Sequence, residues 1–302
     1  MANGSAKMST PAQVGAFLNV LKQHKVKEID TARVYNGGKS EELLGAVGAG
    51  TKLGFAVSTK APGFSPGVLS GEKIKKACYA SLEALKQDKM DIFYFHGPDR
   101  ETPLEEQCKA ANELYQEGKF ERFGVSNHLV GEVQTIYDIC KKKGYVLPTV
   151  YQGGYNPLMR SADELLFPTL RKLGISFYAF SPLGGGYFTR TVDQLRNPAQ
   201  DQRMAAFPVF KEIYVSEKSL KWLEELTKVC EDNGTTPKEG VLRWFMNHSI
   251  LEAEDGVILG ASDEKQVDET LKACEMGPLP EPVVRAFNDL WEKNKDSSWK
   301  YA

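Results

Sequence analysis

The alternation of short apolar runs with longer amphipathic stretches is the feature that most constrains the fold of this chain. Several short runs, such as Ile92-Phe93-Tyr94-Phe95, are apolar without alternation, as expected for parallel strands covered on both faces. The pattern predicts repeated βα units. The predicted strands are residues 27–30, 55–59, 91–95, 122–125, 149–151, 175–180 and 256–259.

Amphipathic segments around these runs predict the helices. Three segments begin with a hydroxyl residue that is followed three positions later by Glu, at Thr102, Ser161 and Thr236, which is the pattern of a helix N-cap. The predicted helices are residues 12–24, 40–47, 72–87, 103–117, 129–143, 162–173, 217–232, 237–247, 263–275 and 281–294.

The spacing of these elements predicts the domain organisation. No Gly-, Ser- or Pro-rich linker divides the chain, so residues 1–302 are expected to form one domain, with residues 1–10 irregular. The interval after the sixth strand leaves room for a long loop, about 186–215, which in a barrel would cover the active site. The predicted fold class is α/β, a (β/α)8 TIM-type barrel.

Composition narrows the function classes. With 302 residues, 41% hydrophobic and 26% charged, the chain has the composition of a globular protein, and disordered, collagen-like and coiled-coil classes are excluded. The 38 basic and 40 acidic residues form no long block of one sign, so no nucleic-acid partner is expected. No apolar run has the length of a membrane span, and residues 1–10 lack the apolar region of a signal peptide.

Cysteine usage indicates the redox environment. The five cysteines, at positions 78, 108, 140, 230 and 274, are widely spaced and include no C-x-x-C pair. This spacing predicts neither a metal site nor a disulfide framework. We expect reduced thiols in a cytoplasmic protein.

Polar side chains recur where each predicted strand ends. Because the carboxyl ends of all strands in a (β/α)8 barrel face one mouth, residues far apart in the sequence converge there. Each residue taken singly is often only a helix cap or a turn residue, so the prediction of a site depends on the whole set. Its members are Asp30, Lys60, His96, Ser126, Asn127, Gln152, Ser181, Gly260 and Ser262.

Six segments carry a resemblance to a known family. They are residues 30–35 (DTARVY), 58–60 (STK), 95–99 (FHGPD), 124–127 (GVSN), 181–186 (SPLGGG) and 259–262 (LGAS). In order and spacing they resemble the motifs of the aldo-keto reductases, over about residues 11–292. Residues 116–120 and 148–152 are most similar to the aflatoxin-aldehyde reductase group. The resemblance implies reduction of an aldehyde or ketone with NADPH, and a homodimer.

The resemblance also implies a catalytic tetrad of Asp30, Tyr35, Lys60 and His96. Hydride transfer to a carbonyl carbon leaves negative charge on the oxygen, which must be stabilised and protonated. Tyr35 would donate the proton, because a neighbouring ammonium such as that of Lys60 lowers the pKa of a tyrosine hydroxyl. Asp30 would hold Lys60, and His96 would orient the carbonyl oxygen.

The same resemblance assigns residues to the nicotinamide end of the cofactor. Ser126, Asn127 and Gln152 would bind the carboxamide, which needs both donors and acceptors. Phe180 stands where the family usually has a Tyr stacked on the nicotinamide, so the stacking face is kept and the hydroxyl is lost.

Other residues are assigned to the phosphates and the adenosine. The glycine-rich segment would bring its backbone close to the pyrophosphate. Ser262 would cap the helix that holds Gln266, and the N-terminus of that helix suits the 2′-phosphate of NADPH. The remaining assignments are Ser181, Leu183 and Gly185 in the glycine-rich segment, Gly260, Thr270, and the cations Arg190, Arg203 and Lys265.

The chain departs from the family pattern before Asp30, where the family normally has another strand. Residues 1–10 are too short and too polar for a buried strand, so the first barrel strand is expected to be absent or substituted. The expected activity is therefore weighed against two alternatives. One is a nucleotide-binding or interaction protein with little turnover, and the other is a redox-neutral biosynthetic enzyme that uses the same site.

Overall fold

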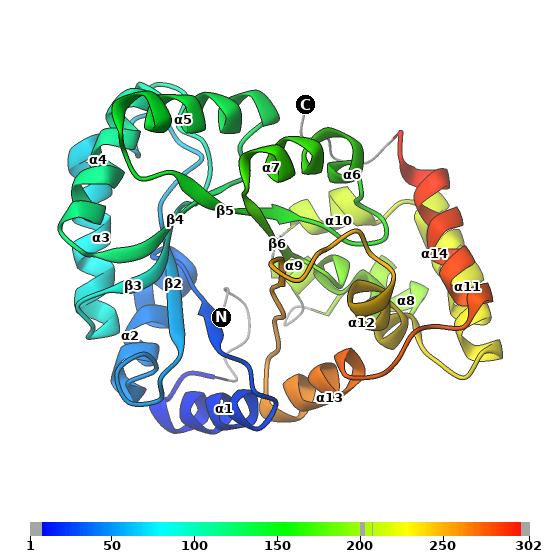
Figure 1. The fold of residues 1–302 in the computed structure, drawn as a ribbon. Helices are drawn as coiled ribbons and strands as arrows, with labels where there is room; N and C mark the ends of the chain where they lie inside the picture. Colours follow the sequence, from blue (N-terminus) through cyan, green and yellow to red (C-terminus); the bar gives the residue numbers. More distant parts are fainter. Residues whose placement is uncertain (1–7, 200–202, 207, 297–302) are drawn as a thin grey trace.

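Seven parallel strands form one curved sheet at the centre of the molecule (Figure 1). A computed structural model describes residues 8–199, 203–206 and 208–296. Each strand pairs in parallel with the next one in the chain, in the order β1 to β7. The strands are β1 (Glu28–Asp30), β2 (Ala56–Ala61), β3 (Met90–Phe95), β4 (Phe120–Ser126), β5 (Pro148–Gly154), β6 (Ser176–Phe180) and β7 (Gly256–Val257). The structure is a curled βα half-barrel, consistent with the predicted TIM-type barrel lacking one strand.

Helices follow the strands and cover the convex face of the sheet (Figure 1). The first part of the chain contributes η1 (Tyr35–Gly38), α1 (Pro11–Gln23), α2 (Lys39–Val47), α3 (Gly71–Leu85), α4 (Leu104–Gln116), α5 (Val130–Lys143), α6 (Ala162–Leu165) and α7 (Phe167–Leu173). The second part contributes η2 (Gly184–Thr189), α8 (Val192–Arg196), α9 (Arg203–Ala206), α10 (Pro208–Tyr214), α11 (Glu217–Asp232), α12 (Pro237–Asn247), α13 (Glu264–Cys274) and α14 (Glu281–Asn294).

The alternating side chains of β3 show how the two faces of the sheet are filled. Phe93 and Phe95 belong to the large apolar core between the strands and the helices. Ile92 and Tyr94 form a separate small cluster with Val150 on the other face, which is the interior of the half-barrel. Both faces are therefore apolar, which explains why the run shows no alternation in the sequence.

The sheet does not close between its two edge strands, β1 and β7. No backbone hydrogen bond joins them among the described residues. The helical layer closes instead, because α1 packs beside α13 on the outside of this gap (Figure 1). His24, which caps α1, contacts Glu275 at 2.8 Å and Asp268 at 2.9 Å. Hydrogen bonds to these carboxylates, first to Glu275 and then to Asp268, raise the pKa of His24 and favour its charged form.

Of the three predicted helix caps, one is misplaced, one has the predicted position without a capping hydrogen bond, and one is confirmed. The Thr102 hydroxyl donates to Asp99 at 2.7 Å, and α4 begins after Pro103 without a side-chain cap. Ser161 makes no capping hydrogen bond, and the predicted helix 162–173 is divided into α6 and α7 because Pro168 cannot donate to a preceding turn. Thr236 does cap α12 and accepts from the Glu239 amide at 3.2 Å.

The segment 186–215 differs from the predicted long loop, because its described residues include η2, α8, α9 and α10. The Thr191 hydroxyl accepts from Gln194 and starts α8, while Leu195 and Tyr214 are buried against the core. Apolar side chains at helical spacing therefore give this segment local structure. Residues 200–202 and 207 of the segment lie outside the described residues.

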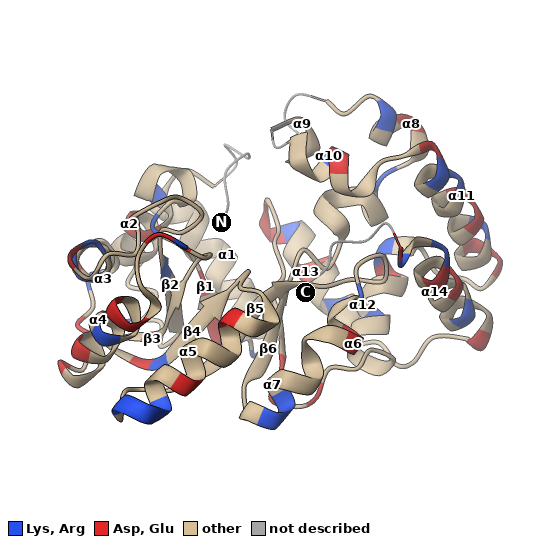
Figure 2. Cartoon of the chain, turned by 90° about the horizontal axis from the view of Figure 1, so that it is seen from above, with Lys and Arg blue, Asp and Glu red and all other residues tan. Residues whose placement is uncertain are grey.

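Charged residues of both signs are interspersed on the outer helices (Figure 2). Acidic and basic segments alternate along α4, α11 and α14, with no continuous basic stripe on these helices (Figure 2). Within the described part of the chain, none of the helices combines the length and the apolarity that a membrane span requires.

Candidate active site

The ends of β1 and β2 bring a lysine and an aspartate together. The Lys60 ammonium donates to both carboxylate oxygens of Asp30, at 2.7 and 2.6 Å, and to the Thr31 carbonyl at 2.6 Å. Lys60 is completely buried, whereas the Asp30 side chain is 15% exposed. A buried ammonium must be paired to remain charged, and Asp30 supplies that partner at the edge of the mouth.

Tyr35 and His96 complete this group. The Lys60 nitrogen lies 5.3 Å from the centre of the Tyr35 ring. The rings of Tyr35 and His96 meet edge to face, with centroids 5.6 Å apart. The structure therefore brings together all four residues that the sequence predicts as the tetrad, from the ends of β1, β2 and β3.

The loop that carries Tyr35 is held by a tight turn and a buried ion pair. Three successive residues after Tyr35 have left-handed backbone, and at Gly38, with φ of 92°, a side chain would collide with Arg33. Arg33 pairs with buried Glu41 at 2.6 Å, and the second oxygen of Glu41 accepts from Thr59 at 2.6 Å. Glu41 therefore joins the Tyr35 loop to the residue before Lys60.

His96 is held as a neutral imidazole near pH 7. Burial lowers the pKa of His96 to about 4, with a further lowering from the Lys60 charge that Asp30 partly offsets. A neutral imidazole has one N–H to donate and is not a strong acid, which suits the orientation of a carbonyl oxygen.

We expect His96 to take up a proton only near pH 4, so it should cause no break in kcat/KM between pH 5 and 7. Nitrogen-15 NMR of the histidine rings measures this directly, with His96→Gln to assign the signal. His24 is the internal control, because its pKa is raised and it should titrate above the ordinary value. Titration of His96 near pH 6.5 would contradict the expected burial of its ring.

Three residues predicted for the nicotinamide carboxamide lie beside the tetrad. Ser126 and Gln152 are buried at the ends of β4 and β5. Asn127, with φ of 61°, donates to the His96 carbonyl at 3.0 Å and to the Ser126 hydroxyl at 2.8 Å. Gln152 donates to Asp30 at 2.9 Å across the interior of the half-barrel, a contact that the sequence did not predict.

The residues predicted for stacking and for the pyrophosphate follow in order at the end of β6. Phe180 ends this strand and is half-buried, and Ser181 has φ of 55°. Asn156 donates to the Ser181 carbonyl at 3.1 Å and stabilises this turn. Leu183 precedes η2, where Gly185 and its neighbours have left-handed backbone, and the Arg190 guanidinium lies directly against Gly186.

The residues predicted around the 2′-phosphate are clustered on α13, with one correction. Asp263, rather than Ser262, is the N-cap, and its carboxylate accepts from the Gln266 amide at 2.8 Å. Ser262 precedes the capping residue, and its backbone amide and hydroxyl donate to the Gln266 side-chain oxygen at 2.6 and 3.0 Å. Thr270 is buried one turn further along α13.

Of the remaining predicted cofactor residues, Gly260 precedes α13 and Lys265 lies in its first turn. Gly260 is exposed between β7 and α13, and the Lys265 side chain is 89% exposed. Arg203 begins α9, and its side chain lies outside the described residues.

Sequence reasoning missed several residues that shape the site. Glu41 has the signal of an ordinary acidic residue in the first turn of a helix, so its buried pairing was not predicted. His128 is buried and its Nδ1 lies 2.9 Å from the Ser126 carbonyl, which stabilises the Asn127 turn. Phe64 is 59% exposed and its ring meets His96 edge to face at 5.8 Å. Phe64 lies in the loop after the predicted strand 55–59, and an aromatic residue in such a loop is the signal by which the sequence could have identified it.

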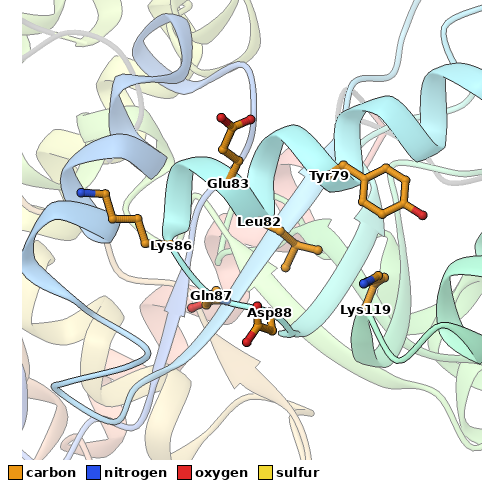
Figure 3. Close-up of a pocket in the computed structure, with 7 residues that line it drawn as sticks. All are labelled: Tyr79, Leu82, Glu83, Lys86, Gln87, Asp88 and Lys119. Atoms are coloured by element: carbon orange, nitrogen blue, oxygen red, sulfur yellow. The ribbon is translucent and has the colours of Figure 1, made fainter.

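A shallow hollow of about 330 Å³ lies away from this group, between the end of α3 and the start of β4 (Figure 3). Lys86 and Lys119 line it together with Glu83 and Asp88, so its charge is mixed. It lies at the amino ends of the strands, whereas the predicted site lies at their carboxyl ends. The hollow is therefore separate from the candidate active site.

Comparison with known proteins gives the family of this chain. The profile of the Aldo/keto reductase family matches residues 1–292. An aldo-keto reductase of Pseudocercospora fijiensis is 36% identical, with 94% of this chain and 99% of that protein covered. Human aldo-keto reductase family 7 member A3 is 37% identical, with 87% and 84% covered. Human aflatoxin B1 aldehyde reductase member 2 is 35% identical, with 94% and 83% covered. This chain therefore belongs to the aldo/keto reductase family and is an enzyme of that family.

Proposed function

We propose that the protein reduces an aldehyde or ketone to an alcohol with NADPH, with Tyr35 as the general acid. The observation that carries this proposal is the meeting of Tyr35, Lys60, Asp30 and His96 at the carboxyl ends of β1, β2 and β3. The order and identity of these residues match the family motifs, and the similarity to reductases over most of the chain supports the same reaction.

The residues at the mouth fit a nicotinamide nucleotide. Phe180 offers a half-buried aromatic face at the end of β6, and the left-handed backbone from Gly184 to Gly186 has no side chains to obstruct a phosphate. Ser126, Asn127 and Gln152 would hold the carboxamide, and Leu183 with Gly185 would follow the pyrophosphate. When bound, NADPH supplies the hydride that reduces the carbonyl carbon.

The protein's own contribution is to bind the carbonyl oxygen and deliver a proton to it. His96, held neutral by burial, would donate its N–H to the oxygen and orient it. The Tyr35 hydroxyl would transfer its proton as negative charge develops there. The Lys60 charge, held by Asp30, would stabilise the tyrosinate that remains.

The direct test is NADPH consumption with a panel of carbonyl compounds. The full chain should oxidise NADPH in the presence of an aldehyde or a diketone and form the alcohol in equal amount, with no reaction when the carbonyl compound is omitted. Tight binding of NADPH without turnover over the whole panel would contradict the proposal.

A nucleotide-binding protein with little turnover is the second candidate function. The contact between Gln152 and Asp30 favours it, because an amide expected to hold the nicotinamide is used within the tetrad. The open edge between β1 and β7 favours it as well, since the family strand beside the nicotinamide would lie there. NADPH binding without turnover would support this candidate, whereas product formation from NADPH and a carbonyl would exclude it. A redox-neutral reaction at the same site would show turnover without net consumption of NADPH.

The preference for NADPH over NADH can be tested at the N-terminus of α13. If the 2′-phosphate lies there, Asp263→Asn should strengthen NADPH binding about fivefold, because removal of one negative charge close to the phosphate is worth about 1 kcal/mol in water. Asn keeps the helix cap, and NADH binding should not change. Fluorescence titration with both nucleotides measures the two affinities. An equal change for NADPH and NADH would place the 2′-phosphate elsewhere.

We also propose that the protein is a homodimer. β1 and β7 are the two edge strands of the sheet, and the outer edge of each has no strand partner among the described residues. An open sheet edge favours pairing with another surface. Light scattering after size exclusion should give about twice the chain mass of 33.6 kDa. A single chain mass at all concentrations would mean that α1 and α13 suffice to cover the gap.

A further inference from the structure

Two tyrosine rings flank the ammonium of Lys60, and the catalytic proposal uses only one of them. The Lys60 nitrogen lies 5.3 Å from the centre of the Tyr35 ring and 5.4 Å from the centre of the Tyr94 ring. Both distances are within the range of about 6 Å in which a ring face attracts a cation. Tyr35 comes from the loop after β1, whereas Tyr94 comes from β3, two residues before His96.

Tyr94 is the register partner of Lys60 on the neighbouring strand. It is completely buried and packs in the interior cluster with Ile92 and Val150. Its hydroxyl makes no hydrogen bond of normal geometry with a described residue, although the Gln152 amide lies beside it. Burial raises the pKa of Tyr94 well above its ordinary value, and the charge of Asp30 raises it further. The Tyr94 hydroxyl therefore keeps its proton and is a weaker acid than an ordinary tyrosine.

A completely buried ammonium needs every available source of stabilisation. The three acceptor atoms around the Lys60 nitrogen, two from Asp30 and one from Thr31, account for its hydrogen bonds. One of the two Asp30 oxygens also accepts a hydrogen bond from Gln152, so the carboxylate is shared between two donors. The Tyr94 ring adds attraction that uses no N–H donor, because it acts through the negative face of the ring.

We propose that Tyr94 is a positioning residue for proton transfer, whose ring face keeps the Lys60 ammonium charged and fixed next to Tyr35. This inference rests on the proposed function only in assigning the proton to Tyr35. The contact between Lys60 and the ring does not depend on the reaction. The hydroxyl of Tyr94 takes no part in this contact, so a ring without the hydroxyl should hold Lys60 equally well.

The test compares Tyr94→Phe with Tyr94→Leu in the full chain. Phenylalanine keeps the ring, so kcat/KM and its pH profile should stay within about twofold of the wild type. Leucine removes the ring, so kcat should fall about tenfold with KM and NADPH affinity nearly unchanged. The high-pH fall in activity should move down by about half a unit to one unit, because Lys60 then loses its proton more easily.

Two further variants separate this effect from loss of packing. Phe93→Leu removes a buried ring from the same strand on the face away from Lys60, and it should leave the pH profile unchanged. Tyr94→Met fills more of the space than Leu and should give the same pH shift if Tyr94→Leu does not fold. A pH shift in Phe93→Leu equal to that in the Tyr94 variants would assign the effect to packing and overturn the inference.

A readout without turnover distinguishes this inference from the proposed function. Lysine labelled with carbon-13 at Cε gives an NMR signal that follows protonation, and the signal missing in Lys60→Met is that of Lys60. In Tyr94→Leu this signal should titrate at lower pH than in Tyr94→Phe. If the wild type has no turnover but the titration shifts, the proposed function fails and the inference stands. Unchanged titration and unchanged pH profile in Tyr94→Leu would overturn the inference.

Discussion

Tyr35→Phe should lower kcat by about 10²- to 10⁴-fold while NADPH affinity stays within about twofold of the wild type. Phenylalanine keeps the ring that meets His96 and faces Lys60, and it removes only the hydroxyl. The loss should therefore lie in the chemical step. Single-turnover measurements of NADPH oxidation separate this step from nucleotide binding.

The matched control for this variant is Tyr115→Phe. Tyr115 is an exposed tyrosine near the end of α4 whose ring packs against Phe120, at the amino end of β4 and away from the mouth. Its variant should keep wild-type kcat and KM. Turnover retained in Tyr35→Phe would show that another group supplies the proton and that the family mechanism does not apply to this chain.

Lys60→Met should reduce both the reaction rate and the stability of the fold. Without the ammonium the Tyr35 hydroxyl is a weaker acid, so kcat should fall by about 10²-fold. The active form carries a protonated Tyr35 beside a protonated Lys60, and activity falls as pH rises and either group loses its proton. Lys60→Met leaves only the tyrosine to titrate and removes the positive charge that lowers its pKa, so the fall should move upward by about one to two pH units. In Tyr94→Leu the ammonium is kept but loses its proton more easily, so the fall should move in the opposite direction.

The stability loss arises because Lys60→Met leaves Asp30 with a mostly buried and unpaired carboxylate. Removal of one partner from such a pair costs about 3 kcal/mol, which urea unfolding can measure. The double variant Asp30→Asn with Lys60→Met removes both charges and should regain much of this stability without regaining activity. A Lys60→Met protein with wild-type stability and an unchanged pH profile would contradict the assigned role of this pair.

The fold could be predicted from the sequence because its signals are local. The apolar run that forms β3 has strand-forming residues. Because successive side chains of a strand point to opposite faces, Ile92 and Tyr94 lie on one face and Phe93 and Phe95 on the other. Helix starts were harder to predict. Thr102 has the residue type of a cap, but Asp99 lies within reach of its hydroxyl and binds it instead.

The sequence predicted that the four tetrad residues lie together, and it predicted the contacts around them less well. Asp30 ends a predicted strand, and Lys60 and His96 come directly after two others. Because the carboxyl ends of all strands in a barrel face one mouth, this placement alone groups the three residues. The contact of Gln152 with Asp30 depends on the curvature that brings β5 opposite β1, and no local pattern in the sequence encodes this distance. The sequence predicted Ser262 as the cap of α13, whereas the structure has Asp263, the next residue. Both residue types are good caps, so the local pattern did not distinguish them.

By itself, the sequence determined the βα order, the face on which each strand residue lies, and the set of polar side chains at the strand ends. These properties follow from residue type and from the period of each element, which act over a few neighbouring residues. Only the tertiary structure decided that Lys60 lies between Tyr35 and Tyr94, that Glu41 joins the Tyr35 loop to β2, and that α1 and α13 close the layer outside the open sheet edge. Those contacts join segments distant in the chain, and they depend on strand register, sheet curvature and helix packing, which are properties of the whole fold.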